Sequence, residues 1–590
     1  MRYNNVYFCI MEIDLSKIKS PADIKGFNLD QLNLLSEELR AVLIRKLAAH
    51  GGHVGPNLGV VEATVALHYV FDAPKDKIVF DVSHQSYVHK MLTGRIEAFI
   101  SPEDYDKVTG YTSPSESEYD LFEVGHTSTS ISLATGLAKA RDLQGGKENV
   151  IAFIGDASLG GGMALEALNY APELKSNIIV ILNDNQMSIA ENHGELYTHL
   201  KELRDSNGAS SNNIFKALGY EYIYVKEGND LRSLIKAFRE AKDRDRAVLV
   251  HINTMKGEGL PVAETNKETF HFSAPFDAKT GALLNMDSSE TYVDVFVKTI
   301  LDGIRKDPKL VLLTAGTPGA FGFSPAHRAE AGKQMVDVGI AEQDAVTMSA
   351  GLAKGGAHPV MGVVSTFLQR AYDQLSHDVA INNLPASFVV FYGGMFGMND
   401  VTHLGFFDIA MISNIPNITM LAPASAEEYK AMLELAMDNS EGPLVVRTPG
   451  GALVSQKEPV NKDFTKYVKI EDGSDVAIIA EGAFLPFARK AAALAREKGV
   501  NPMVVNPRIL SNVDEEFLDG LKDFRMIVTV EDGIIDGGFG QKVSTYMNRY
   551  GVKTINLGIK KEFVDRYDVK DFLKANSLTP EQIAEILVKG

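Results

Sequence analysis

The chain has 590 residues, 45% of them hydrophobic and 23% charged, which is typical of a soluble globular protein. Because this length exceeds what one hydrophobic core can hold, we expect roughly three to five domains. The formal net charge of −18, without a run rich in Lys and Arg, argues against nucleic acid as the main partner. No apolar run approaches about 18 residues, and no basic start precedes an apolar core, so neither a membrane span nor a secretory signal is expected.

Cys9 is the only cysteine, and it lies in the first ten residues, before the first helix-like pattern. We expect these residues to form a loose extension. A single cysteine excludes an internal disulfide framework and a cysteine-based metal site. It also fits a reducing compartment, so we expect a cytoplasmic protein.

The chain repeats one pattern: a short apolar strand, a turn rich in Gly or Ser, and an amphipathic helix. Strands are expected at residues 149–156, 176–185, 309–316, 358–367, 387–394, 417–425, 474–482 and 524–532, and helices at 161–171, 368–380, 426–437 and 483–499. Strands without polar alternation, separated by helices, indicate parallel sheets covered on both faces. The predicted fold class is therefore α/β, with doubly wound parallel sheets.

Two polar stretches without clear periodicity interrupt this pattern, at residues 263–290 and 450–475. Such breaks favour domain boundaries. We therefore predict three α/β domains, which cover residues 1–285, 286–455 and 456–590. The third carries no motif with an evident chemistry.

The stretch FIGDASLGGG at residues 153–162 predicts a buried strand that runs into a glycine-rich turn. Turns of this kind commonly bind phosphate, yet no Lys or Arg lies between Asn149 and Leu174. The one charged residue in the turn is Asp156. Asn185 follows the next predicted strand, 29 positions after Asp156.

Because the carboxyl ends of neighbouring parallel strands meet at one edge of a sheet, we expect Asp156 and Asn185 to lie close together. Their side-chain oxygens suit Mg²⁺, which shares its ligand sphere with substrate phosphates. Taken singly, the Asp would more commonly cap a helix and the Asn would lie in a turn. The spaced pair, at the ends of two buried strands, favours a magnesium site in which the metal neutralises phosphate.

This spacing resembles the thiamine diphosphate motif, in which GDG is followed by a later Asn. Further matching segments occur in order: GGHVGPNLGVVEATVALHYVFD, DVSHQSYVHKMLTGR, EVGHTSTSIS, ILNDNQMSI, GIAEQDAVT and STFLQRAYDQLSHDVA. On these segments nearly the whole chain resembles the 1-deoxy-D-xylulose-5-phosphate synthases of the transketolase superfamily. The resemblance implies a homodimer of three-domain chains. The first domain would bind diphosphate with Mg²⁺, and the second would bind the aminopyrimidine of thiamine diphosphate. The third resembles the transketolase C-terminal domain, and we expect it to stabilise the dimer.

The resemblance implies small-molecule substrates and no membrane partner. In the family, pyruvate loses CO₂ and its two-carbon unit joins D-glyceraldehyde 3-phosphate to give 1-deoxy-D-xylulose 5-phosphate, a step of isoprenoid and thiamine biosynthesis. By resemblance the cofactor-binding residues are His84, Gly125, His126, Thr127, Ser128, Asp156, Ala157, Ser158, Asn185, Met187, Ile189, Glu342 and Phe367. Among them Asp156, Asn185 and the main-chain carbonyl of Met187 would bind Mg²⁺.

The catalytic residues that the resemblance implies are His53, His84, His271, Glu342, Arg370 and His403. Glu342 would be a buried carboxyl group with a raised pKa that holds a proton at N1′ of the aminopyrimidine. The histidines would move protons. Without the resemblance, Glu342 is simply a helix-start Glu favoured by the macrodipole, and a loop His is more commonly a structural hydrogen bonder.

The chain departs from the family where the acceptor phosphate binds. Two family arginines that accompany Arg370 there are replaced by Tyr392 and Gly450, and the family segment DGQTHQG reads NDVTHLG, with Asn399 and Asp400 in its first two positions. Losing two charge-assisted phosphate contacts weakens acceptor binding, and added acids facing the pocket would repel a phosphate further. We therefore hypothesise an acceptor that is unphosphorylated or differently charged.

Four further positions differ from the family: Ala157 replaces the last Gly of GDG, Leu260 and Val364 each replace a Tyr, and Asp344 replaces a His. Arg447 matches a family position outside the phosphate-binding site. Two alternatives stay open beside the synthase reaction. One is a paralogue with transketolase-like chemistry on another donor or acceptor. The other is a catalytically silent, cofactor-binding regulatory protein, against which the retained acid and histidine set argues.

Overall fold

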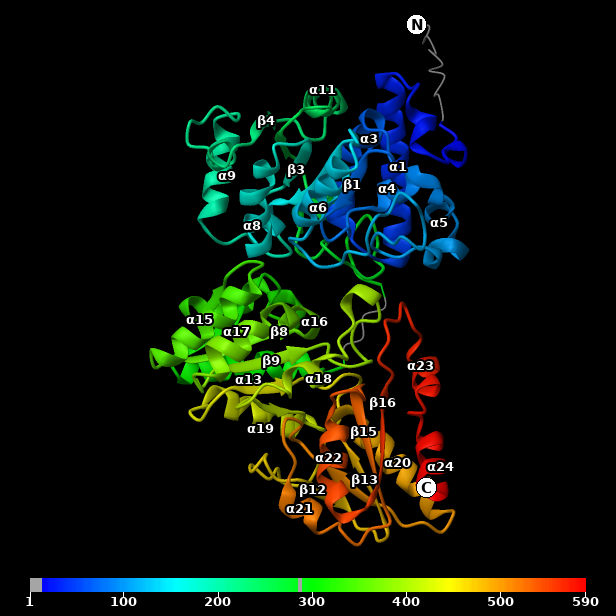
Figure 1. The fold of residues 1–590 in the computed structure, drawn as a ribbon, viewed down its shortest axis with the longest axis vertical. Helices are drawn as coiled ribbons and strands as arrows, with labels where there is room; N and C mark the ends of the chain where they lie inside the picture. The colour runs from blue at the N-terminus through cyan, green and yellow to red at the C-terminus, as the bar shows by residue number, and fades with distance from the viewer. Residues whose placement is uncertain (1–12, 285–288) are drawn as a thin grey trace, which may run out of the picture. The chain divides into compact units, whose positions relative to one another are not determined.

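The computed structural model describes residues 13–284 and 289–590, which form two compact units. Cys9, the predicted N-terminal extension and the predicted boundary between residues 285 and 286 lie outside the described residues. The first unit contains one sheet and the second contains two (Figure 1). The division into three domains stays a prediction. Each of the three predicted ranges contains one sheet.

The sheet of the first unit has five strands, all paired in parallel, in the order β1-β2-β3-β5-β4. They are β1 (Lys77–Phe80), β2 (Val150–Gly155), β3 (Ile178–Asp184), β4 (Glu221–Val225) and β5 (Ala247–Asn253). The main helices are α1 (Leu29–His50), α3 (Val61–Val70), α6 (Ser130–Leu143), α8 (Gly162–Tyr170), α9 (Glu195–Asp205) and α11 (Leu231–Ala241). The strands expected at 149–156 and 176–185 are β2 and β3.

Successive residues of the central strands face two different hydrophobic clusters. Ile151 and Phe153 of β2 belong to the cluster that includes α1, α3 and α11, whereas Ala152 and Ile154 belong to the one that includes α6, α8 and α9. Because both faces of the sheet are covered by helices, its strands need no polar alternation. The α/β class with a doubly wound parallel sheet is confirmed.

The second unit begins with a six-stranded sheet, ordered β10-β11-β9-β8-β6-β7 and parallel throughout. Its strands are β6 (Leu310–Thr314), β7 (Met335–Asp337), β8 (His358–Val364), β9 (Ser387–Phe391), β10 (Thr419–Leu421) and β11 (Leu444–Arg447). Its main helices are α13 (Tyr292–Lys306), α15 (Glu342–Lys354) and α19 (Ala426–Met437).

The third sheet has the order β12-β14-β13-β15-β16 and is parallel except for the edge strand β12. Its strands are β12 (Val468–Glu471), β13 (Val476–Ala480), β14 (Met503–Asn506), β15 (Met526–Ile534) and β16 (Lys553–Ile559). Its main helices are α20 (Leu485–Arg496), α22 (Phe539–Met547) and α24 (Pro580–Lys589). One hydrophobic cluster includes residues of both sheets of the second unit, so the two sheets pack together.

The helix predicted at residues 368–380 is present, but it is not a regular α-helix. After α16 (Ser365–Leu368) the chain forms a 3-10 turn at Gln369–Ala371, then α17 (Tyr372–Gln374) and a π-helix at Leu375–Ala380. Ala371, with φ −107° and ψ 22°, marks the irregular point of this helical stretch. The strand expected at 358–367 therefore ends at Val364.

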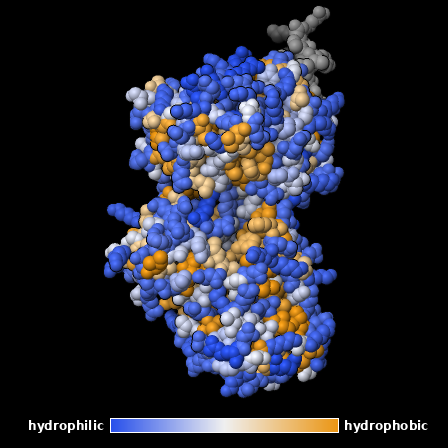
Figure 2. All heavy atoms as spheres, in the orientation of Figure 1, coloured by the Kyte–Doolittle hydropathy of each residue, from blue (hydrophilic) through white to orange (hydrophobic). Residues whose placement is uncertain are grey.

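Figure 2 shows that hydrophilic residues cover most of the visible face of both units, with apolar residues gathered in patches. Among residues 13–284 and 289–590, no helix combines the length and apolar character needed to cross a membrane.

Gly394, which follows β9, is a position where the fold requires glycine. Its φ is +78°, and a Cβ atom there would lie 1.8 Å from Asp532 Oδ2 of the third sheet. Met395 N, next along the chain, donates a hydrogen bond of 2.8 Å to Asp532 Oδ1. The close approach lets a buried carboxyl group of the third sheet hold the chain that leaves β9.

We expect Gly394→Ala to destabilise the second unit for two reasons. The left-handed backbone conformation costs about 1 to 2 kcal/mol, and overpacking costs about 1 to 3 kcal/mol more. Gly451→Ala is the matched control, because Gly451 has φ +80° and no atom within 4 Å of its Cβ position. Thermal unfolding measures both variants. Equal losses would show that Asp532 does not restrict this turn.

Candidate active site

The carboxyl edge of the first sheet gathers several of the predicted site residues. His84 follows β1, Asp156 follows β2 and Asn185 follows β3. Because these strands are parallel, their carboxyl ends lie along one edge, where α/β sheets bind ligands.

Asp156 occupies the first position of α7 (Asp156–Leu159) and is 2% exposed. Its Oδ2 accepts a hydrogen bond of 2.9 Å from Asn192 Nδ2, and it forms no ion pair with any residue that the structure describes. Burial and the negative charge of Asp184 raise the pKa of Asp156 to about 7. A buried carboxyl group without a paired cation gains stability when a cation binds, so this residue fits a metal ligand.

The predicted partners of Asp156 lie in the turn after β3. Asn185 Oδ1 accepts a hydrogen bond of 3.2 Å from Met187 N, and Gln186 has φ +64°. Asn185, Met187 and Ile189 are all half-buried. No cluster of three His, Cys, Asp or Glu suited to a metal occurs in the described part of the chain, whereas the predicted set is one carboxylate, one amide and one main-chain carbonyl. The metal site stays a prediction.

Asp81, which the sequence analysis missed, holds the turn at residues 125–128. Its buried carboxylate accepts hydrogen bonds from Ser128 N (2.8 Å) and Ser130 N (3.0 Å). Ser128, at φ +71°, also donates from Oγ to the main-chain oxygen of Ser158 (2.7 Å). The predicted phosphate-binding turn of Gly125, His126, Thr127 and Ser128 is thereby tied to α7, which carries Asp156, Ala157 and Ser158.

Three predicted catalytic histidines of the first unit meet. The ring centroid of His53 lies 4.9 Å from that of His84 and 5.9 Å from that of His271, and the rings of His84 and His271 stack at 5.3 Å. Burial and the positive charge of Lys256 hold the pKa of His271 well below its usual value. His271 is therefore neutral at physiological pH.

Asn57, also missed from the sequence, positions two of these histidines. It is fully buried, and its Nδ2 donates to the main-chain oxygens of His53 (2.8 Å) and His84 (2.7 Å). Its Oδ1 accepts a hydrogen bond of 3.0 Å from Tyr87 N. One amide side chain therefore fixes two loops that are distant in the sequence.

Lys256 is a basic residue at this edge that the sequence analysis missed. It follows β5, is 1% exposed, and donates from Nζ to the main-chain oxygen of Ser188 at 2.6 Å. Its Nζ lies 3.1 Å from His271 Nδ1. Burial lowers its pKa to about 7, although the charge of Asp156 opposes this shift. A local search around the glycine-rich turn could not find it, because it comes from a later strand.

In the second unit, Glu342 opens α15 and is 6% exposed. Burial raises the pKa of its carboxyl group, and the nearby Arg370, with Nη1 3.6 Å from Glu342 Oε2, opposes that shift. Arg370 follows β8 and Glu342 follows β7, so both lie at the carboxyl edge of the six-stranded sheet.

Phe367 and His403 lie at the same edge. Their ring centroids are 5.6 Å apart at an angle of 75°. Burial lowers the pKa of His403 to about 4, so its imidazole is neutral at physiological pH. The second unit thus brings Glu342, Arg370, Phe367 and His403 to the ends of β7, β8 and β9.

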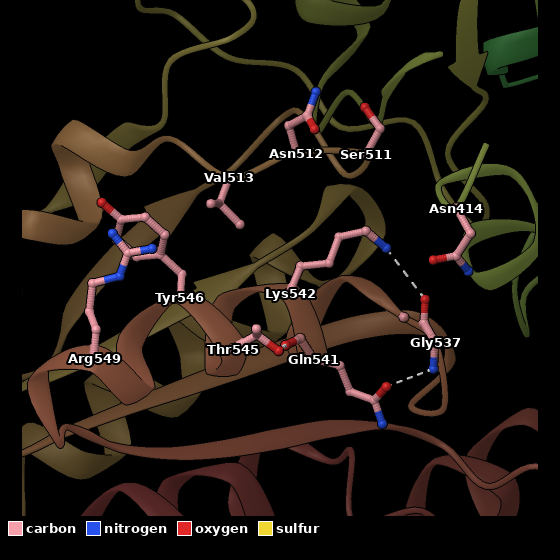
Figure 3. Close-up of a pocket in the computed structure, with 11 residues that line it drawn as sticks. Asn414, Ser511, Asn512, Val513, Gly537, Gln541, Lys542, Thr545, Tyr546 and Arg549 are labelled. Carbon is pink, nitrogen blue, oxygen red and sulfur yellow. Dashed lines mark hydrogen bonds between the residues drawn. The ribbon is translucent and has the colours of Figure 1, made fainter. Parts of the chain in front are cut away.

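A separate cavity of about 460 Å³ lies beside α22 (Figure 3). Lys542 Nζ there donates to Ser413 Oγ (2.7 Å) and Gly537 O (3.4 Å), and Gln541 Oε1 accepts from Gly537 N (2.9 Å). None of the predicted site residues lines this cavity.

Three family models match the chain in order: 1-deoxy-D-xylulose-5-phosphate synthase at residues 15–213, the pyrimidine-binding domain of transketolase at 290–455, and the transketolase C-terminal domain at 466–583. A solved transketolase mutant of Pichia stipitis is similar over 94% of this chain and 96% of its own, at 18% identity and a TM-score of 0.45.

The 1-deoxy-D-xylulose-5-phosphate synthase of Shouchella clausii is 37% identical over 98% of this chain and 98% of its own. That of Heliobacterium modesticaldum is 39% identical over 97% of this chain and 95% of its own. The chain belongs to the 1-deoxy-D-xylulose-5-phosphate synthase family. Members of this family use thiamine diphosphate with a divalent metal, and the α/β fold described above is that of a thiamine diphosphate-binding transferase.

The departures from the family fall into two kinds. Ala157, Val364 and Leu260 are buried. Asp344 is exposed in the first turn of α15. The Asp400 side chain is held within its own turn, where Oδ1 accepts hydrogen bonds from Thr402 N (2.9 Å) and Thr402 Oγ (2.5 Å).

Arg447 is held by buried acidic side chains of its own unit. It is 2% exposed, and its guanidinium donates to Asp408 Oδ2 (2.7 Å) and to the main-chain oxygen of Asp532 (2.8 Å). Tyr392 has φ +56° and donates from its hydroxyl to Ala320 O at 2.9 Å. A Cβ atom on Gly450 would lie 2.7 Å from Phe396 Cβ, so no larger residue fits there without a shift.

We expect Asn57→Ala to lower the free energy of unfolding by about 3 kcal/mol, because it leaves buried main-chain groups without hydrogen bonds. We also expect turnover to fall by about tenfold to a hundredfold, because the loops of His53 and His84 are no longer held. Asn149→Ala is the matched control: Asn149 is equally buried and hydrogen-bonded to Asp76 and Asp243, but it lies at the amino end of β2. Thermal unfolding and turnover with the family's substrates measure both variants. If the two lose turnover equally, Asn57 has no positioning role.

Proposed function

We propose that this protein is a thiamine diphosphate-dependent transferase that removes CO₂ from pyruvate and joins the remaining two-carbon unit to D-glyceraldehyde 3-phosphate. The product would be 1-deoxy-D-xylulose 5-phosphate, for isoprenoid biosynthesis. Whole-length similarity to the synthases carries this proposal, together with the buried acids Asp156 and Glu342 at the carboxyl edges of two parallel sheets. Nothing in the comparisons favours the paralogue or the silent regulatory protein.

The first unit would hold the diphosphate and Mg²⁺. Asp156, Asn185 and the carbonyl of Met187 would bind the metal, and the turn at residues 125–128 with the amides of Ala157–Ser158 would approach the phosphates. A buried carboxyl group without an ion pair supports this assignment, because a bound cation supplies the missing countercharge. Lys256 lies at the same edge, where burial lowers its pKa to about 7.

The second unit would hold the aminopyrimidine. Glu342 would keep a proton at N1′, for which its burial and raised pKa are suited. Phe367 would stack on the ring. When bound, thiamine diphosphate would supply the carbon nucleophile for pyruvate and a ring that takes up the electron pair released with CO₂.

The histidines would move protons on the reacting groups. Because burial keeps His271 and His403 neutral at physiological pH, each can accept a proton from a substrate hydroxyl group. His53 and His84, whose rings lie 4.9 Å apart, would act on the same substrate. Arg370 would bind the acceptor as well as lie beside Glu342.

We also infer a cytoplasmic homodimer that acts on small molecules without a membrane or nucleic-acid partner. The single cysteine and the net charge of −18 support the compartment and the absence of nucleic acid. Sedimentation of the purified protein tests the dimer.

Pyruvate consumption with thiamine diphosphate and Mg²⁺ tests the proposed reaction. We expect consumption to require an aldehyde acceptor and to be faster with D-glyceraldehyde 3-phosphate than with D-glyceraldehyde at matched concentrations. A preference for the free aldehyde would instead favour the acceptor change that Tyr392 and Gly450 suggest. No consumption with either acceptor would overturn the proposal.

Tyr392→Arg should lower the KM for D-glyceraldehyde 3-phosphate by about tenfold, which corresponds to one charge-assisted phosphate contact, and leave the KM for D-glyceraldehyde unchanged. The substitution is made alone, because an arginine at Gly450 would collide with Phe396. Tyr392→Phe is the control, since it removes only the hydrogen bond to Ala320. An equal effect on both acceptors would place Tyr392 away from the acceptor phosphate.

A further inference from the structure

The loop after β9 contains a chain of three side chains, Asp400, Thr402 and His403. Asp400 precedes a short 3-10 helix at Val401–His403, and its Oδ1 accepts hydrogen bonds from Thr402 N (2.9 Å) and Thr402 Oγ (2.5 Å). Thr402 Oγ lies 2.7 Å from His403 Nδ1. The main chain closes the turn, because His403 N donates to Asp400 O at 2.9 Å.

The direction of these hydrogen bonds determines the tautomer of His403. A threonine hydroxyl has one hydrogen to donate, and an ionised carboxylate can only accept. Because Asp400 Oδ1 accepts from both Thr402 N and Thr402 Oγ, the Thr402 hydrogen is committed to Asp400. Thr402 Oγ must then accept from His403, which places a proton on Nδ1 and leaves Nε2 as the acceptor.

The same loop is fixed from its other side by the segment at residues 565–567. Asn399, at the position where the family segment begins with an acid, donates from Nδ2 to Tyr567 O (3.0 Å). Val401 N donates to Asp565 Oδ1 (3.2 Å), and Arg566 N donates to Asn399 O (2.7 Å). Asn399 is thus turned toward the segment after β16, and Asp400 is the carboxylate of this loop that reaches His403 through Thr402.

We propose that Asp400 is a positioning residue, which acts through Thr402 to fix His403 as the Nδ1–H tautomer, so that Nε2 carries the lone pair that can accept a hydrogen bond from a hydroxyl group of the substrate. This inference rests on the proposed function for the identity of that substrate. In this tautomer, Nε2 of His403 can accept a hydrogen bond from a hydroxyl group but cannot pair with a carbonyl or phosphate oxygen, because an unprotonated Nε2 repels such oxygens. His403 lies beside Phe367, which the proposed function assigns to the cofactor.

The first test reads the tautomer directly and needs no substrate. Protein labelled with ¹⁵N in histidine is compared with the His403→Gln variant to assign the two ring nitrogens of His403. We expect the wild type near neutral pH to show a protonated Nδ1 and an unprotonated Nε2. Asp400→Ala and Thr402→Val should shift His403 toward the opposite tautomer, and Thr402→Ser, which keeps the hydroxyl group, should restore the wild-type signature.

The second test is a kinetic cycle. Asp400→Ala should lower kcat by about tenfold to a hundredfold with little change in the KM for pyruvate, and it should have no further effect in a His403→Ala background. Asp344→Ala, which removes an exposed carboxylate from α15, controls for the loss of a negative charge.

An Nε2–H tautomer in the wild type, a tautomer unchanged by Asp400→Ala, or additive kinetic losses in the cycle would overturn the inference. A wild-type protein that consumes no pyruvate would contradict the proposed function and leave the tautomer result standing. The two failures are therefore distinguishable.

Discussion

Two carboxyl groups withdrawn from water, at the carboxyl edges of parallel sheets, are the constraint on which the rest of this structure depends. Asp156 and Glu342 each open a helix that follows a strand, and they are 2% and 6% exposed. A buried carboxylate is costly unless a cation or hydrogen-bond donors replace water. Their neighbours differ: Asp184 disfavours the charged form of Asp156, whereas Arg370 favours that of Glu342. The negative surroundings of Asp156 attract a metal cation, whereas the pKa of Glu342, which burial raises despite Arg370, suits a held proton.

Around these acids, buried polar side chains hold loops that have little secondary structure of their own. Asp81 and Asn57 do this in the first unit. In the second unit the third sheet contributes, because Asp532 of β15 binds Met395 N and residues 565–567 bind the loop of His403. The sequence analysis expected the third domain only to stabilise a dimer. Its contacts add a role in positioning the loop after β9.

The apolar runs of buried parallel strands made β2, β3 and the α/β class predictable, and with them the ends where Asp156 and Asn185 lie. Asn57, Asp81 and Lys256 could not be found this way, because their hydrogen-bond partners are mainly main-chain groups far away in the sequence, such as His84 O for Asn57. The irregular helix geometry at Ala371 could not be predicted either, because no Pro or Gly lies in this segment. The roles given to the histidines and Glu342 come from family resemblance, and no local pattern would have assigned them.

The central claim is that these buried acids serve one thiamine diphosphate-dependent carbon–carbon bond formation. The most direct measurement is ¹³C NMR of the products from pyruvate labelled at its carbonyl carbon, with D-glyceraldehyde 3-phosphate, thiamine diphosphate and Mg²⁺, in the wild type and in Glu342→Gln. The account predicts that the label moves into a new ketose carbonyl in the wild type, at a rate about 10² to 10⁴ times higher than in the variant. Label that stays in pyruvate, or a variant as fast as the wild type, would contradict it.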